Sequence, residues 1–319
     1  MKIKFLKKKQ SILPDLIKGS KMKYLLIFLL ISIPLSAQAE WSFLNHSTLF
    51  NNPLAYPRSP SLGLSINTSI YQNKRLFYFD AVIGKSLSLI CYDYQQTLGI
   101  ELGLEGGAWL TLIQKDSTSF LLLTEDYLIA IPLSFRLNNF IFTIKWNHIS
   151  AHMGDGMGEL MEKKTSKKEK ETLEFYRNFA KSYDINLSLA QPILYSRDFV
   201  SSLFSYQYAI KSIQCRSYLH LGYIYKLVPE EVWNKNHYIG VGTEFKIWND
   251  QISPYGAIDI TWNQDTESTD ISTQLGFLFK PTWNTHSLFI NLNTFNGKER
   301  KGQLLGSNLN RVGIGLMIR

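Results

Sequence analysis

The sequence predicts an all-β protein, an antiparallel transmembrane β-barrel of about 12–14 strands that follows an N-terminal signal peptide. Three observations predict this fold class. Apolar and polar residues alternate over many segments of roughly ten residues, which is the strand length of a membrane barrel. No segment after residue 39 approaches the roughly 18 apolar residues that a spanning helix needs. A sheet that spans a membrane must also close on itself, because lipid offers no hydrogen-bond partners to the backbone N–H and C=O groups of an open edge.

The leader, residues 1–39, has the features of a secretory signal peptide. Lysines precede an apolar run at residues 25–33, and residues 37–39 form an A-x-A cleavage site. Cleavage there leaves Glu40 as the mature N-terminus and predicts export to the outer membrane. Met22 is an alternative start of translation, and an uncleaved anchor is the alternative to cleavage.

The charge of the chain is concentrated in this leader. Residues 1–39 contribute a net +7 of the formal +8, so the remaining chain carries only +1. The basic balance therefore does not indicate a nucleic-acid-binding face. The two cysteines, Cys91 and Cys215, exclude a disulfide-rich scaffold and are either one bridge or two packing thiols.

The mature chain, residues 40–319, is predicted to be a single barrel domain. In each predicted strand one set of alternate residues is apolar, whereas the other set mixes glycine, hydroxyl and charged side chains. This pattern suits one face toward lipid and one toward a polar lumen. Turn signals such as Asn138-Asn139 separate the strands. The clearest strands are 98–105, 127–137, 140–147, 237–247, 257–262, 271–280, 287–293 and 312–319.

Charged residues on the polar faces are predicted to line the lumen. Such side chains tune the selectivity of a pore. The alternative is a narrow lumen that its own salt bridges close. The predicted lumen charges are Glu101, Glu105, Arg136, Lys145, Glu244, Lys246, Asp259 and Lys280.

Residues 153–173 interrupt the strand pattern with interspersed lysines and glutamates. A mixed charge run of this kind is typical of a solvated loop. The alternative is a contact between its lysines and the anionic phosphates of outer-leaflet lipid.

The densest chemistry in the sequence lies just before that loop. Side chains alternate along a strand, so His148, Ser150 and His152 are expected on one face, and Gly154 permits a turn that returns Asp155 toward them. The Cα atoms of His148 and Ser150 are expected to lie about 7 Å apart, which allows their side chains to meet.

Three interpretations of this motif remain open. In the first, His148 is the base for a Ser150 nucleophile, Asp155 or Glu162 orients the base, and His152 stabilises developing negative charge. In the second, the two imidazoles and Asp155 bind zinc or iron, but residues four apart on a strand are about 13 Å apart and would need a bend. In the third, the motif only shapes the barrel rim. We assign no cofactor.

Several stretches resemble an uncharacterised bacterial family catalogued as domain of unknown function 1207. The resemblance covers residues 41–319 and implies an exported, outer-membrane, β-rich protein with no established activity. Where the family commonly has an acid after the central Gly-Asp, this chain has Gly156, so any role of that acid is absent here. The matching stretches are residues 49–58, 125–127, 131–136, 148–155, 296–297 and 313–315.

The His-x-Ser arrangement, with Glu162 about a dozen residues on, is also similar to the lipid A deacylase barrels of the outer membrane. In those proteins a His-Ser-Glu set cuts an acyl chain at the membrane rim, but their asparagine-rich stretch after the serine is missing here. The favoured hypothesis is therefore a rim hydrolase for an acyl ester of outer-membrane lipid or lipopolysaccharide. The alternatives are a channel for small polar solutes and a structural or adhesive surface protein.

Overall fold

The computed structural model describes most of the chain from residue 39 onward. The described residues are 39–45, 49, 51–71, 74–114, 120–154, 195–228, 237–249, 251–264, 266–280, 287–301 and 308–319. Contacts separate residues 1–39 from residues 40–319, and the fold is that of the second unit. The predicted signal peptide and most of the predicted charged loop lie outside the described residues.

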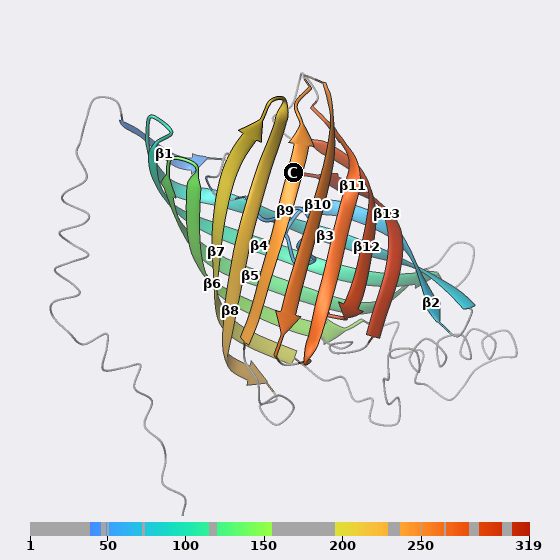
Figure 1. Cartoon of the computed structure of the whole chain (residues 1–319). Coiled ribbons are helices and arrows are strands. Elements are labelled where there is room, and N and C mark those ends of the chain that lie inside the picture. The colour runs from blue at the N-terminus through green and yellow to red at the C-terminus, as the bar shows by residue number, and fades with distance from the viewer. Residues whose placement is uncertain are drawn as a thin grey trace, which may run out of the picture. The chain divides into compact units, whose positions relative to one another are not determined.

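Twelve antiparallel strands close into a barrel (Figure 1). Each strand from β2 to β13 pairs with the next, and β13 returns to pair with β2 through Leu62 and Ile318. A thirteenth strand, β1, lies beside β3. The predicted fold class is confirmed. The strands are β1 (Ala39–Asn45), β2 (Leu62–Tyr71), β3 (Lys74–Tyr94), β4 (Leu98–Gln114), β5 (Phe120–Leu137), β6 (Phe140–Met153), β7 (Tyr195–Ile210), β8 (Ile213–Val228), β9 (His237–Ile247), β10 (Ile252–Asn263), β11 (Ser268–Phe279), β12 (Leu288–Lys298) and β13 (Asn308–Ile318).

The alternation of side chains sets the two faces of the wall. On β5, Tyr127, Ile129 and Ile131 are exposed on the outside, whereas Leu128 and Ala130 between them are buried in the interior. The same alternation runs along the other strands of the barrel, so large apolar side chains cover its outer surface. No helix among the described residues is long and apolar enough to cross a membrane.

The two ends of the barrel differ in their connections. At one end the strands are joined across residues 95–97, 138–139, 211–212, 248–251 and 280–287, and the C-terminus ends there. At the other end lies the longest connection, between β6 and β7, which spans residues 154–194. We call these the short-turn end and the long-loop end.

The interior is packed rather than hollow. A cluster of buried apolar side chains, which includes Trp109, Ile149 and Phe199, joins the inner faces of β4 to β8. The remaining interior positions are largely polar. The segment that precedes β2 lies inside the barrel, where Leu49, Asn52 and Leu54 donate hydrogen bonds to interior carboxylates. We call its described residues, 49 and 51–61, the plug.

Candidate functional site

Three residues of the predicted motif lie together on the outer face of β6. His148, Ser150 and His152 alternate with the buried residues Ile149 and Ala151, and all three are partly exposed. The pairing of β5 with β6 has no register shift, so the motif shares its face with the exposed apolar residues Ile144 and Trp146, which precede it on β6. The motif ends β6 at the long-loop end, where the chain enters residues 154–194.

His148 contacts an acid that the motif does not contain. Its Nδ1 lies 2.5 Å from Oδ1 of Asp198, which is directly opposite on β7. When Asp198 is ionised it accepts a hydrogen bond from Nδ1–H, so Nε2 is left as the free acceptor of the ring. The Asp198 side chain is only 13% exposed, whereas that of His148 is 37% exposed. The pair therefore presents an oriented imidazole on the outer wall.

The sequence-based interpretation missed Asp198 and proposed Asp155 or Glu162 as its orienting acid. Asp155 and Glu162 lie outside the described residues. A signal for Asp198 was present, because it shares the outward parity of Val200 and Phe204. A charged residue on the apolar face of a barrel strand is costly unless it has a partner or lies near the boundary.

Ser150 and His152 flank this pair along the same face. Ser150 lies between Tyr127 of β5 and Ser196 of β7 in the register. The described residues contain no hydrogen bond to the Ser150 hydroxyl. The His152 ring packs edge-on against Tyr127, with their centroids 5.8 Å apart.

An irregularity in β8 brings two more side chains to the outer wall. The register between β7 and β8 shifts between Asp198 and Phe199, because Asp198 pairs with Lys226 and Phe199 with Ile224. Tyr225 is the extra residue of this β-bulge, and both it and Lys226 are exposed. A bulge re-aims side chains in this way.

Both of these side chains contact the motif. The Lys226 Nζ lies 3.6 Å from Oδ2 of Asp198. The Tyr225 hydroxyl accepts a hydrogen bond of 2.7 Å from the Trp146 indole, and Trp146 stacks beside His148 with centroids 6.5 Å apart. His148, Ser150, Asp198 and Lys226 together are called the outer-wall cluster below.

The predicted lumen charges bind the plug and one another. Glu101 accepts a hydrogen bond of 2.7 Å from the backbone N–H of Leu49. Lys145 donates to Glu105 at 2.6 Å and to the Asn52 side chain at 3.1 Å. Asn52 also donates to Glu105. These groups therefore hold a piece of the chain itself rather than facing an open lumen.

The centre of the plug is bound through its backbone. Glu244 accepts a hydrogen bond from the Leu54 N–H and pairs with Arg216 at 2.8 Å. Arg216 donates to the carbonyl oxygens of Asn51 and Asn52, at 2.6 and 3.2 Å. Hydrogen bonds to charged groups are stronger than neutral ones, and burial raises their effect.

The remaining predicted lumen charges are placed as follows. Arg136 pairs with Asp93 at 2.5 Å near the short-turn end. Asp259 accepts hydrogen bonds from Tyr218, His220 and Thr261 at 3.0, 3.1 and 2.6 Å. At the end of β9, the ammonium groups of Lys246 and Lys280 lie 5.7 and 3.6 Å from the centroid of the Trp248 ring.

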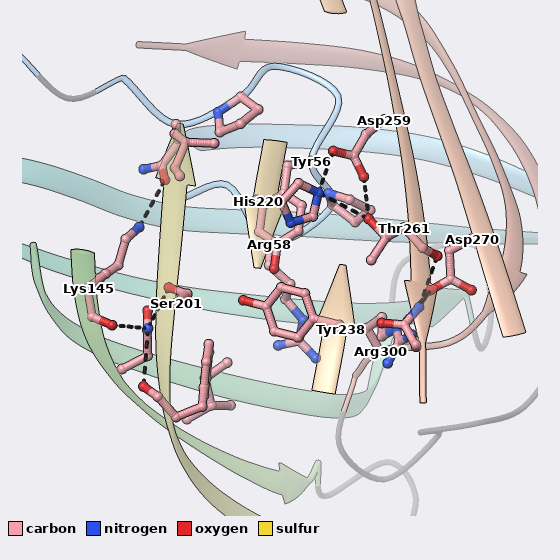
Figure 2. A pocket seen from close by; sticks show the side chains of 18 of the residues that line it. Tyr56, Arg58, Lys145, Ser201, His220, Tyr238, Asp259, Thr261, Asp270 and Arg300 are labelled. Atoms are coloured by element: carbon pink, nitrogen blue, oxygen red, sulfur yellow. Dashed lines mark hydrogen bonds and ion pairs between the residues drawn. The ribbon is translucent and has the colours of Figure 1, made fainter. Parts of the chain in front are cut away.

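The tip of the plug ends beside a small interior cavity of about 90 Å³. Figure 2 shows Tyr56 and Arg58 among wall residues that include His220, Tyr238 and Arg300. Arg58 pairs with the fully buried Asp126 at 2.6 Å, and the Tyr56 ring lies 5.2 Å from that of His220. Burial raises the pKa of the Tyr56 phenol, so it stays protonated. The cavity has room for a few water molecules, at about 15 Å³ each.

Two further expectations concern metals and thiols. The described residues contain no group of three or more histidine, cysteine or acidic side chains that could hold a metal ion, and Asp155, the third ligand of the metal alternative, lies outside them. Cys91 is buried and Cys215 is partly exposed, and both are free thiols.

Comparison with solved structures finds similar folds at low sequence identity. Outer membrane phospholipase A from Escherichia coli is 12% identical, with 86% of this chain and 94% of that chain covered and a TM-score of 0.47. The transport unit of the autotransporter AIDA-I from Escherichia coli is 11% identical, with 86% and 95% covered and a TM-score of 0.43. LpxR from Salmonella typhimurium is 7% identical, with 80% and 99% covered and a TM-score of 0.36.

No curated protein matches the sequence significantly. A family model does match, over residues 41–319, which is nearly all of the sequence after the leader. The matched range contains the plug, the motif on β6 and the closing strand β13. The chain belongs to the family described as protein of unknown function DUF1207.

Proposed function

We propose that this protein is an outer-membrane β-barrel that hydrolyses an acyl ester of a membrane lipid on the outer face of its wall. The observation that carries the proposal is the 2.5 Å contact between His148 and Asp198, with Ser150 two residues along the same face. An imidazole oriented by an acid beside a serine is the arrangement that activates a hydroxyl for nucleophilic attack.

The location in a membrane is supported by the outer surface. Exposed aliphatic and aromatic side chains recur on every strand from β2 to β13, far beyond the patches that soluble proteins expose. Membrane barrels have short periplasmic turns and longer extracellular loops. By this rule the long-loop end lies outside the cell, and the outer-wall cluster lies at the level of the outer leaflet.

The chemistry follows from the order of the side chains. Nε2 of His148 takes the Ser150 proton while Oγ bonds to the carbonyl carbon of the ester, and Asp198 stabilises the imidazolium that forms. His148 then gives the proton to the leaving alcohol oxygen as the C–O bond breaks. Water attacks the acyl-serine by the same proton route, which releases a fatty acid and restores Ser150.

Charge develops on the carbonyl oxygen during both steps, and we assign its stabilisation to His152. This side chain follows Ser150 on the same face of β6. Catalytic hydrogen bonds commonly tighten only when the substrate is bound, so the Ser150 hydroxyl needs no partner beforehand.

The filled interior argues against the channel alternative. The plug engages Glu101, Lys145 and Glu244, which the sequence pattern assigns to a lumen, and two cavities beside the plug hold only about 90 and 110 Å³. The wall of the barrel, rather than its lumen, offers the accessible chemistry.

A fluorophosphonate probe tests the nucleophile in the purified, folded protein. We expect intact mass spectrometry to find one adduct, located on Ser150, with Ser150→Ala unlabelled and His148→Ala labelled far more slowly. Ser202→Ala is the matched control, because Ser202 lies on the same outer face of the neighbouring strand β7. Heat-modifiable gel migration verifies folding. Equal labelling of Ser150→Ala, or no labelling of folded wild type, refutes the proposal.

A further inference from the structure

The outer-wall cluster contains one cation that the proposed hydrolysis does not use. The Lys226 side chain is 61% exposed, on a wall whose exposed side chains are largely aliphatic and aromatic. A cation on the lipid face of a barrel is costly at the bilayer midplane and nearly neutral at the interface. The place of Lys226 near the end of β8, at the long-loop end, therefore favours the level of the lipid headgroups.

The position of Lys226 is built by the backbone. The bulge in β8 inserts Tyr225, so Lys226 faces outward beside it rather than into the barrel. Without the extra residue, Lys226 would have the inward parity of Ile224, a member of the buried apolar cluster. A bulge that places two consecutive side chains outward is a common device beside functional sites.

Two neighbours fix this region further. Asp198 lies 3.6 Å from the Lys226 ammonium on one side. The hydrogen bond of 2.7 Å between Trp146 and the Tyr225 hydroxyl ties β6 to the bulge on the other. Aromatic side chains with a polar atom favour the membrane interface, where their rings meet acyl chains and their polar atoms meet water.

Among the described residues Lys226 has one ion pair, with Asp198, which leaves most of its ammonium available. An ammonium carries three donors, and its exposed side can donate hydrogen bonds to an anionic oxygen of a ligand. Lys226 and His148 pair with the same residue of β7, so they are two strands apart, or about 10 Å between backbones. A long lysine side chain spans part of this distance. The separation that remains between its ammonium and the His148 ring is of the same scale as that between the phosphate of a membrane lipid and its acyl ester.

We propose that Lys226 binds the phosphate of the substrate lipid, so that the site selects phosphate-bearing lipids over neutral acyl esters. This inference rests on the proposed function, because it names the substrate class of that site. Lys226 is a specificity residue here, while His148 and Ser150 perform the reaction.

The test compares two esters with identical acyl chains in the same detergent micelles: phosphatidylglycerol and diacylglycerol. For Lys226→Gln we expect kcat/KM on phosphatidylglycerol to fall about tenfold, or ~1.4 kcal/mol, through KM. The loss on diacylglycerol should be much smaller than on phosphatidylglycerol, because diacylglycerol has no phosphate, and Lys226→Arg should retain most of the preference. Lys211→Gln, an exposed lysine at the short-turn end, is the matched control.

Each outcome decides the inference. An equal loss on both esters would make Lys226 a support for Asp198 alone and overturn the inference, as would no loss on either. Lipid A as a third ester separates a phospholipid from lipopolysaccharide as the phosphate source, and added inorganic phosphate should compete only weakly, because it lacks the acyl chains.

A binding measurement separates this inference from the proposed function. Ser150→Ala protein is incubated with equimolar phosphatidylglycerol and diacylglycerol, and native mass spectrometry records which lipid is retained. Retention of phosphatidylglycerol that disappears in Ser150→Ala/Lys226→Gln supports the headgroup site even if wild type hydrolyses nothing. Hydrolysis by wild type without any headgroup preference leaves the proposed function intact and removes the inference.

Discussion

At the scale of single residues, the account depends on how His148 is held. Asp198 contacts Nδ1 and thereby fixes which ring nitrogen is free to accept a proton from Ser150. An acid in this role orients the imidazole and stabilises its charged form. Both effects require a carboxylate at this position, not merely a side chain of the same shape.

Asp198→Asn tests that requirement. The asparagine amide can present its NH₂ group to Nδ1 and so favour the wrong tautomer, and we expect kcat to fall on the order of 10³–10⁴-fold with KM nearly unchanged. Asp93→Asn is the control, because Asp93 also pairs with a cation but lies near the short-turn end. Steady-state kinetics on micellar ester measures both variants. Full activity of folded Asp198→Asn would remove Asp198 from the mechanism.

The sequence could place His148, Ser150 and His152 on one face but could not supply Asp198 or Lys226. Period-two alternation puts His148, Ser150 and His152 on one face from local information alone. Asp198 reaches His148 only through the register of β6 against β7, and 41 residues, 154–194, separate these strands in the chain. Register is set by the whole sheet, so a local pattern could not identify the partner.

At the scale of elements, the strands follow from the alternation of apolar and polar residues. The eight segments expected from alternation overlap β4, β5, β6 and β9 to β13. Strands β3 to β8 are the longest, with 14 to 21 residues, because strand pairing continues beyond the roughly ten residues that the predicted membrane span needs. The plug has no such period. Its proline-containing stretch Asn51–Arg58 has no 2.0- or 3.6-residue repeat, so its place inside the barrel was not predicted.

The plug makes a prediction at this scale. Charged side chains of the interior bind it at Glu101, Glu105, Lys145, Arg216 and Glu244. We expect full-length protein in planar bilayers to show no conductance steps. Replacing residues 51–58 by an equally long glycine–serine stretch should produce discrete steps, because it removes the side chains that fill the interior and their contacts with the wall.

A gentler variant covers the case in which that replacement fails to fold. Asn52→Ala with Arg58→Ala removes the side chains that contact Glu105, Lys145 and Asp126 and keeps the backbone. Brief openings of this variant would agree with a plug held by those contacts. Silent traces from both variants, with heat-modifiable migration intact, would show that other parts of the chain close the interior.

At the scale of the whole molecule, two surfaces have separate roles. The interior is closed by apolar packing and by a plug that buried charges anchor, so it stabilises the barrel. The outer wall is mostly apolar, and near the long-loop end of β6, β7 and β8 it carries the polar group in which His148, Asp198 and Lys226 meet. A reaction on this wall reaches lipid directly from the membrane, without passage of substrate through a lumen.

The central claim is that this outer wall removes an acyl chain from a membrane lipid with Ser150. The most direct measurement is a lipid mass-spectrometric comparison of outer membranes that contain wild type or Ser150→Ala at matched folded levels. We predict that a phosphate-bearing lipid loses one acyl chain, with release of the corresponding fatty acid, only with wild type. Identical lipid and fatty-acid profiles from the two membranes would contradict the account.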